Sequence, residues 1–344
     1  MEKLRLGRSG ITVCHLAFGA LPLQRCGINE AVAILGAAVD AGVEFFDTAR
    51  MYSDSEHKLG VAFKGIRRRL VIASKTKGAN PAEIEAHLAQ SLAELQTDYL
   101  DLYQFHNAAD VPRPGDGTRR YETMAALKKS GVIRALGITS HSLKVALDAA
   151  DSGLYDTVQF PVSLLSTDEE LGLVEKCRVA DVGLIAMKAL AGGLITNIPA
   201  ACAFMRHLGT VLPIWGIQSM DELAEFLRLE ADPPRYDEAM KEAVRAEREA
   251  LGGRFCRACG YCLPCPQNID IPWIARLDRL LRRSPWQRFA EPDWVEKMRT
   301  AKSCVRCGAC SGRCPYKLDS AELVADNIVD YVNFMRAHGQ DITL

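Results

Sequence analysis

Short apolar runs and longer amphipathic segments alternate along the first two thirds of the chain. Runs rich in β-branched and aromatic residues begin near Val13, Val43, Leu70, Leu100, Arg134, Thr157, Gly183 and Leu212. Neighbouring runs start 23 to 34 residues apart, which leaves room for one strand and one helix in each interval. Most runs are apolar at consecutive positions, as expected for strands covered on both faces. Eight such units predict a closed parallel (β/α)8 barrel of the TIM type.

Residues at the expected helix boundaries support this order of elements. Three pairs have the spacing of a capping box: Ser53 with Glu56, Thr167 with Glu170, and Ser219 with Glu222. Asn80 and Pro81 combine a capping residue with a proline in the first turn. Three glycines stand where helices should stop: Gly42, Gly131 and Gly153. A doubly wound dinucleotide-binding sheet is the alternative, but no G-x-G-x-x-G motif follows the first expected strand. The pattern therefore favours the barrel.

The periodic pattern stops near residue 230. The segment that begins Ala231-Asp232-Pro233-Pro234 has the composition of a linker, and a charged helix is expected from Asp237 to Leu251. We therefore expect a barrel domain over residues 1–230, a linker and helix over 231–251, and a small second domain over 252–344.

Composition excludes several classes of function. Of the 344 residues, 48% are hydrophobic and 25% are charged, which is ordinary for a globular protein. The 42 basic and 43 acidic residues nearly cancel, so no overall field attracts nucleic acid or an anionic membrane. The first residues lack the apolar stretch of a signal peptide, and no apolar run reaches the roughly 18 residues of a membrane span. We expect a cytoplasmic protein.

Eight of the 12 cysteines are concentrated near the C-terminus, in two runs. The first run is Cys256-x2-Cys259-x2-Cys262-x2-Cys265-Pro266, and the second is Cys304-x2-Cys307-x2-Cys310-x3-Cys314-Pro315. Without a secretion signal, such grouping predicts metal binding rather than disulfides.

The second run has the spacing of bacterial two-cluster ferredoxins, in which the fourth cysteine binds the other cluster. We therefore predict two 4Fe–4S clusters. One is expected on Cys256, Cys259, Cys262 and Cys314, and the other on Cys304, Cys307, Cys310 and Cys265. The first run is one residue shorter before its last cysteine. Two zinc sites are the alternative, but structural zinc usually joins two separate C-x2-C knuckles.

Four polar residues stand at or just after the ends of expected strands. Asp47 ends the second strand, Lys75 ends the third and His106 ends the fourth, while Tyr52 lies five residues after Asp47. Barrel enzymes place their chemistry at such strand ends. An ammonium group beside a phenol lowers the phenol's high pKa, and a buried ammonium needs a carboxylate partner. The four residues together predict an acid for carbonyl reduction.

The stretch from Phe45 to Glu56, ending in Leu59-Gly60, resembles the signature of the aldo-keto reductase family. The segments Leu6-Gly7-Arg8-Ser9-Gly10 and Phe18-Gly19 are similar to that family's hairpin and first strand. The resemblance covers about 220 residues. It implies that Tyr52 donates the proton, Lys75 lowers its pKa, Asp47 holds Lys75, and His106 orients the substrate. The cysteine region resembles helical dicluster ferredoxin modules, which are fused to one branch of this family.

The resemblance also implies an NADPH or NADH site without a glycine-rich phosphate loop. The nicotinamide would face Ser140, His141 and Gln159, with Gly19 and Ala20 lining its reactive side. The remaining contacts would come from Met187, Lys188 and Ala189 at the pyrophosphate, and from Gly216, Gln218 and Glu222 at the adenosine end. Many family members have a basic residue near the position of Gln218, which pairs with a 2′-phosphate. The uncharged Gln218 leaves the choice between NADPH and NADH open.

The leading hypothesis is therefore NAD(P)H-linked hydride transfer to or from a small carbonyl or alcohol substrate. The clusters would exchange electrons with a ferredoxin or flavodoxin. Five arginines are typical of a solvated helix face or of a docking site for such an acidic carrier: Arg276, Arg279, Arg282, Arg283 and Arg288. Two alternatives stay open. The chain is an electron-transfer protein whose barrel docks a redox partner, or it is a carbonyl reductase with purely structural clusters.

Overall fold

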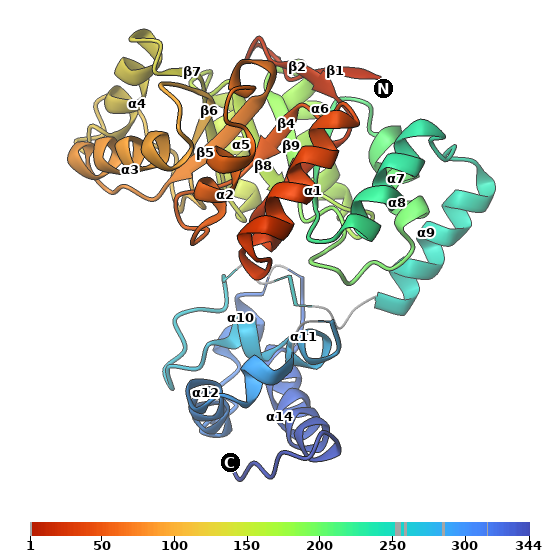
Figure 1. Ribbon diagram of the computed structural model, residues 1–344. Helices are drawn as coiled ribbons and strands as arrows, with labels where there is room; N and C mark the ends of the chain where they lie inside the picture. The colour runs from red at the N-terminus through yellow and green to blue at the C-terminus, as the bar shows by residue number, and fades with distance from the viewer. Residues whose placement is uncertain (1, 252–255, 258–259, 284–285, 315) are drawn as a thin grey trace. The chain divides into compact units, whose positions relative to one another are not determined.

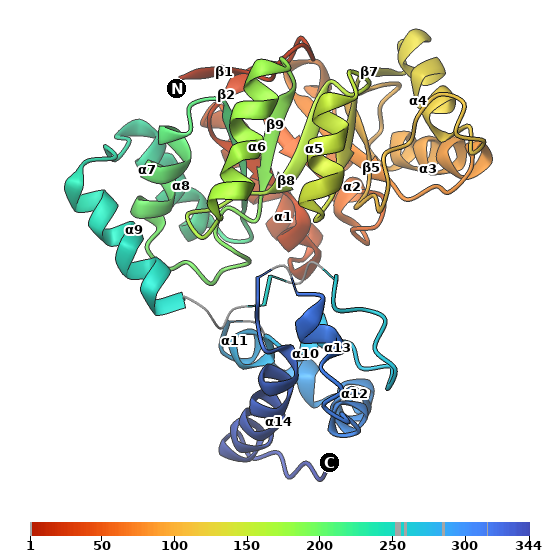
Figure 2. The same ribbon diagram turned by 180° about the vertical axis from the view of Figure 1, so that it is seen from behind.

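The computed structural model describes residues 2–251, 256–257, 260–283, 286–314 and 316–344. It divides the chain into two compact units (Figures 1 and 2). The first comprises Met1–Gly192 and Asn197–Val244, and the second comprises Gly193–Thr196 and Arg245–Leu344. Within the described residues, no helix combines the length and the apolar character needed to cross a membrane.

The first unit is built around a closed barrel of eight parallel strands in the order β10-β3-β4-β5-β6-β7-β8-β9. Their bounds are β3 Ala17–Gly19, β4 Phe45–Asp47, β5 Val71–Thr76, β6 Leu100–Phe105, β7 Ile133–Thr139, β8 Thr157–Pro161, β9 Gly183–Met187 and β10 Val211–Gly216. Strands that follow one another in the sequence lie side by side, and β10 closes the barrel against β3. The (β/α)8 prediction is confirmed.

The start of the first barrel strand was placed wrongly. Val13 lies in β2 (Thr12–Cys14), which pairs only with β1 (Lys3–Arg5) as a separate antiparallel sheet. The apolar residues of this hairpin pack into the inner core of the barrel, together with inward residues of the strands. Val13 and Leu6 are fully buried for that reason, and their burial gives the segment the same apolar pattern as a barrel strand.

Helices surround the barrel in both ribbon views (Figures 1 and 2). They are α1 Ile28–Asp40, α2 Ser55–Ala62, α3 Pro81–Glu94, α4 Arg120–Lys129, α5 Leu143–Asp151, α6 Asp168–Val179, α7 Ile198–His207 and α8 Met220–Ala231, with short 3-10 helices η1 Leu21–Arg25 and η2 Arg67–Arg69.

Most of the expected helix boundaries are confirmed. Asn80 caps α3, and Thr167 with Glu170 forms a complete capping box on α6. The three expected stop glycines all have positive φ: Gly42, Gly131 and Gly153.

The second unit is helical in its described part. Helix α9 (Glu238–Leu251) spans the unit boundary, and the rest comprises α10 Ile271–Ile274, α11 Leu277–Arg283, η3 Trp286–Ala290, α12 Pro292–Lys302, α13 Ala309–Gly312 and α14 Ser320–Ala337. Its core is mainly aliphatic, with the aromatic side chains of Phe289, Trp294 and Tyr331 buried among the others. The rings of Phe289 and Trp294 meet edge to face with centroids 4.7 Å apart, and the buried Tyr331 hydroxyl donates to the carbonyl of Phe289 at 2.7 Å.

Candidate functional site

The four polar residues predicted at strand ends lie at one end of the barrel. Asp47 ends β4, Lys75 lies near the end of β5, His106 follows β6 directly, and Tyr52 lies in the loop between β4 and α2. The Lys75 Nζ donates to Asp47 Oδ2 at 2.5 Å and to the Thr48 carbonyl at 2.7 Å. The same nitrogen lies 5.2 Å from the centroid of the Tyr52 ring. The Tyr52 and His106 rings meet edge to face with centroids 5.6 Å apart.

The surroundings of Lys75, Tyr52 and His106 shift the pKa of each and favour one protonation state at neutral pH. Burial alone would lower the pKa of Lys75, but the attraction of Asp47 and Tyr52 raises it, so the lysine stays charged. Burial raises the pKa of Tyr52, and the charge of Lys75 opposes that rise only in part. Tyr52 therefore carries its proton. Burial, assisted by the charge of Lys75, lowers the pKa of His106 to about 3, so its ring is neutral.

A buried carboxylate that the sequence did not single out for this site holds the loop that carries Tyr52. Glu56 was expected to cap a helix from Ser53, but α2 begins at Ser55 without a side-chain cap. Glu56 instead turns inward, where it pairs with Arg50 and accepts a hydrogen bond from Ser74 Oγ at 2.6 Å. Because Ser74 lies on β5 beside Lys75, this contact fixes the loop to the strand that carries the lysine. Local spacing cannot reveal a partner on another strand.

The residues expected beside the nicotinamide lie on adjacent strand ends. The Ser140 amide donates to the Gln159 carbonyl at 3.1 Å, and the Ser140 hydroxyl donates to the Ala108 carbonyl at 2.8 Å. Gln159 accepts from Gln104 Nε2 at 3.0 Å. Burial raises the pKa of Asp47, and the charge of Lys75 and hydrogen bonds from both side-chain amides oppose that rise only in part. The sequence missed Gln104, which lies 55 residues away from its partner.

The other nicotinamide-site residues occupy the same end of the barrel. His141 follows Ser140, and its Nδ1 lies 2.8 Å from Asn107 Oδ1. Met187 ends β9, Lys188 has a φ of 59°, and Ala189 is buried. Ala20 is buried next to Gly19, and its amide donates to the Asp47 carbonyl at 2.8 Å.

Two observations bear on whether this end suits a nicotinamide and a carbonyl substrate. The buried Nδ1 of His106 has no hydrogen-bond partner among the described residues. The groups around it are a phenol, an ammonium and side-chain amides, which match a carbonyl oxygen and a carboxamide. The residues present therefore fit the cofactor.

Gln218 lies in a small polar network at the end expected to bind adenosine. The backbone amide of Gln218 donates to Glu222 Oε2 at 2.8 Å. The Glu222 side chain therefore does not complete the capping box that was expected with Ser219. Arg25 Nη1 donates to Gln218 Oε1 at 3.2 Å. Arg25 ends η1 and is 193 residues distant in sequence, and sequence reasoning missed it. A Cβ at Gly216 would lie 3.0 Å from the side chain of Pro22, so the packing of η1 explains this glycine.

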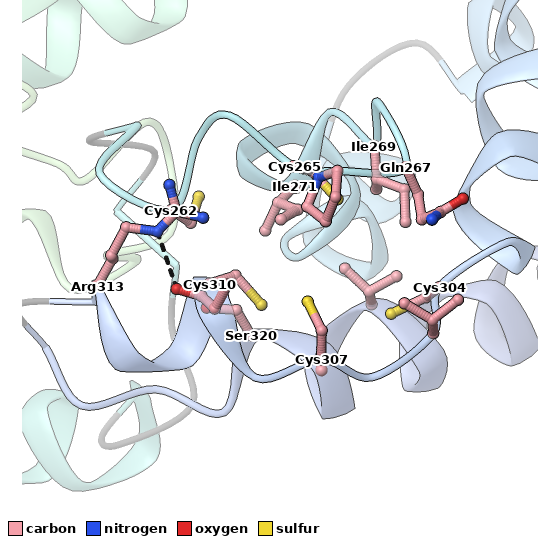
Figure 3. A pocket seen from close by; sticks show the side chains of 15 residues that line it. Cys262, Cys265, Gln267, Ile269, Ile271, Cys304, Cys307, Cys310, Arg313 and Ser320 are labelled. Atoms are coloured by element: carbon pink, nitrogen blue, oxygen red, sulfur yellow. Dashed lines mark hydrogen bonds between the residues drawn. The ribbon is translucent and has the colours of Figure 1, made fainter.

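In the second unit, five of the clustered cysteines line one cavity: Cys262, Cys265, Cys304, Cys307 and Cys310. The last four are the residues predicted to hold one cluster. The sulfur atoms of Cys304, Cys307 and Cys310 point into the space between the two runs (Figure 3). Of the other predicted ligands, Cys256 and Cys314 are half-buried, and Cys259 lies outside the described residues.

The two runs repeat their backbone conformation. Asn268 and Lys317 each follow the last cysteine of a run by three residues, and each has a φ of 54°. The amide of Asn268 donates to the Cys265 carbonyl at 3.0 Å, and that of Lys317 to the Cys314 carbonyl at 3.1 Å. Gly260 and Gly308, each directly after a second cysteine, also share positive φ. Asp270 and Asp319 then stand at the N-caps of α10 and α14, so the internal repeat extends beyond the cysteines.

This arrangement suits an anionic iron–sulfur cluster. Arg306 and Gly308 have positive φ, a conformation that occurs in the anion-binding backbone turns of many iron–sulfur sites. Ser320 and Ala321, the first residues of α14, also line the cavity, and the positive end of a helix favours negative charge. Within the described ranges, no three His, Cys, Asp or Glu side chains gather closely enough to hold a single ion.

Comparison with known proteins agrees with both halves of this description. The model of the aldo/keto reductase family matches residues 16–207, which is more than half of the chain. The chain belongs to the aldo/keto reductase family. A separate model, that of the 4Fe–4S dicluster domain, matches residues 255–319. The protein is therefore an aldo/keto reductase with a C-terminal dicluster domain, as the resemblance implied.

Several curated aldo/keto reductase relatives are similar over the barrel. The uncharacterized oxidoreductase YrpG of Bacillus subtilis is 30% identical over 228 residues, which span 57% of this chain and 68% of that protein. Protein tas of Escherichia coli is 30% identical over 57% of this chain and 70% of its own length. The 6-dehydroglucose reductase of Novosphingobium aromaticivorans is 29% identical over 64% of this chain and 88% of its own length.

Solved structures give the same fold. A putative aldo-keto reductase from Pseudomonas aeruginosa is 26% identical, with a TM-score of 0.60 over 67% of this chain and 94% of that one. An aldo-keto reductase from Bacillus halodurans in its holo form has a TM-score of 0.63 over 72% and 96%, and at 22% identity it supports the fold alone.

Proposed function

We propose that the barrel interconverts an aldehyde or ketone and the corresponding alcohol with a nicotinamide cofactor. In the reductive direction, carbonyl, NAD(P)H and a proton give alcohol and NAD(P)+. The observation that carries this proposal is the buried Lys75–Asp47 ion pair beside Tyr52, with a neutral His106 at the edge of the phenol ring.

Each of the four side chains has a part in the proton transfer. A nicotinamide held beside Ser140, His141 and Gln159 would supply the hydride at the carbonyl carbon. Tyr52 donates its proton to the carbonyl oxygen, and the positive charge of Lys75 stabilises the phenolate that remains. Asp47 keeps Lys75 charged in a site from which water is excluded. Neutral His106 offers a second hydrogen bond to the same oxygen.

The test compares Tyr52→Phe with Tyr121→Phe in NAD(P)H oxidation driven by aldehydes, ketones and oxo-sugars. Oxo-sugars are included because one relative is named a 6-dehydroglucose reductase. Tyr121 lies on α4, and its hydroxyl makes only a 3.4 Å contact with the Leu154 carbonyl, so its loss serves as the control. Tyr52→Phe should lower kcat by about 10²–10⁴-fold with unchanged NADPH binding. Near-normal turnover would refute the assignment of Tyr52.

We infer that the dicluster domain holds two 4Fe–4S clusters and exchanges single electrons with a partner. The cysteine-lined cavity and the repeated turns support this inference. Anaerobically purified protein should contain about eight irons and eight sulfides per chain. Cys304→Ser separates this function from a structural role of the clusters. Lost electron exchange with retained NAD(P)H turnover supports the inference, and loss of folding supports the structural role.

A further inference from the structure

Three arginines of the cluster that the sequence offered as a docking site contact groups in their own unit: Arg276, Arg282 and Arg288. Arg282 forms a bidentate salt bridge with Asp330, with both distances 2.7 Å. The guanidinium of Arg276 lies over the Trp273 ring at 4.8 Å, and that of Arg288 lies over the Phe289 ring at 5.3 Å. These side chains support the helical core, so a partner has to be sought elsewhere on the unit.

A different basic surface surrounds the second cysteine run. Between residues 302 and 319 the chain has four basic residues and one acidic residue, all exposed: Lys302, Arg306, Arg313, Lys317 and Asp319. We call the four basic residues the basic rim. Within the described residues, Arg306 attracts the Asp319 carboxylate and helps to lower its pKa, but neither Arg306 nor Lys317 forms a side-chain hydrogen bond or salt bridge. The equivalent stretch around the first run, residues 254–270, has two basic residues, Arg254 and Arg257, and one acidic residue, Asp270, so the positive charge is greater around the second run.

One residue of the basic rim, Arg313, lines the cysteine-lined cavity, and another, Arg306, stands in the sequence between its lining residues Val305 and Cys307. Cys307 is exposed, whereas the buried Cys262 belongs to the other predicted ligand set. Val305 lines the same cavity and is 63% exposed. Arg313 lies at the cavity (Figure 3). Its Nη2 donates to the Pro264 carbonyl at 3.0 Å, which ties the two runs together. An apolar side chain enclosed by charges has the composition of a small protein–protein contact.

We propose that the basic rim docks a small acidic one-electron carrier against the cluster held by Cys265, Cys304, Cys307 and Cys310. The proposal rests on the electron exchange proposed above. The exchange moves one electron and neither makes nor breaks a bond. The carrier is reduced by one electron as the cysteine-held centre is oxidised by one, or the reverse. Charge complementarity selects an acidic carrier and raises the rate of encounter.

The test uses the full-length protein, purified anaerobically with its clusters and reduced with dithionite. Stopped-flow absorbance measures its second-order reaction with an acidic plant-type 2Fe–2S ferredoxin, and calorimetry measures binding. The test variant is Arg306→Glu/Lys317→Glu. The control is Arg336→Glu, at the far end of α14, which places it about 24 Å along the helix from Ser320. Iron content and reduction of lumiflavin, a neutral small acceptor, report whether the clusters are intact in each variant.

The double variant should react with ferredoxin at least about tenfold more slowly than wild type at low salt and bind it correspondingly less tightly. High salt should slow wild type toward the rate of the variant, because it screens exposed charges. Arg336→Glu should stay within about twofold of wild type, and basic cytochrome c should not be slowed by the double substitution. If the double variant matches wild type with ferredoxin, the docking proposal is overturned. If iron-loaded wild type fails to reduce even lumiflavin, the underlying electron exchange is overturned instead.

Discussion

The two units differ in what stabilises their functional side chains. In the barrel, Lys75 and Asp47 neutralise one another, both are buried, and no added group is needed to balance their charges. In the dicluster domain, the described cysteines form no disulfide, and five of them line one cavity where an inorganic cluster would bind. A substitution in the barrel site should therefore leave a buried charge without its protein partner. A substitution of a cysteine in the second unit should instead weaken the binding of an iron–sulfur cluster.

The largest expected effect comes from removing the buried ammonium. Lys75→Met leaves the Asp47 carboxylate buried without its partner, and losing one member of a buried ion pair costs about 3–5 kcal/mol. We expect urea unfolding of the barrel to shift by that amount, with loss of carbonyl reduction. Lys58→Met is the matched control, because Lys58 is also buried but its partner Asp54 is 54% exposed and can be solvated. Equal effects of the two variants would contradict the account.

The second-largest expected effect is a loss of iron from the second unit. Cys310→Ala should remove one of the two clusters and lower the iron content to about four per chain. Cys177→Ala replaces a buried thiol in the barrel and should leave the iron content unchanged. NADPH binding should be the same in both variants, as measured by quenching of protein fluorescence. Full iron content in Cys310→Ala would remove this residue from the ligand set.

The stability of the barrel should also depend on pH through His106. The folded protein keeps His106 neutral down to about pH 3, whereas the unfolded chain protonates it below about 6.5. Protonation therefore favours unfolding, and stability is lost as the pH falls from 6.5 toward 3. His106→Asn should reduce the loss of barrel stability between pH 7 and 5 by at most about 2 kcal/mol, measured by urea unfolding at both values. The same pH slope in both proteins would contradict the assigned environment of His106.

The smallest expected effect concerns the choice of cofactor. Arg25 provides a positive charge beside Gln218, whose own side chain is uncharged. We expect Arg25→Ala to raise KM for NADPH about tenfold, as the loss of one contact between a charged group and phosphate would, and to leave KM for NADH unchanged. Gln218→Lys should have the opposite effect on NADPH. Parallel changes with both cofactors would mean that Arg25 supports the loop rather than the 2′-phosphate.

The sequence predicted those features of the fold and of the site that follow from the periodicity of apolar residues and from polar residues at strand ends. The barrel, the cap of Thr167, and the location of Asp47, Lys75 and His106 at one end all follow from repeating apolar runs that end in a polar residue. The first strand was misplaced because Val13 is buried beneath the barrel by the hairpin, and burial alone does not reveal which sheet a residue joins.

The remaining features depend on contacts between distant segments. Glu56 was expected at a helix start, yet its partner Ser74 comes from the next strand. Nothing in the spacing of Arg25 and Gln218 connects η1 with the start of α8, since only closure of the barrel between β10 and β3 brings them together. The arginines of α11 seemed available in the sequence, but Arg282 pairs with Asp330 on α14.

The most direct test of hydride transfer in the barrel follows a labelled atom. NADPH carrying deuterium at C4 of the nicotinamide is incubated with the best carbonyl substrate, and the alcohol is analysed by mass spectrometry and NMR. The account predicts one deuterium at the carbinol carbon from one face of the nicotinamide, formed about 10²–10⁴-fold more slowly with Tyr52→Phe. Alcohol without deuterium, or formation at the same rate by Tyr52→Phe, would contradict the central claim.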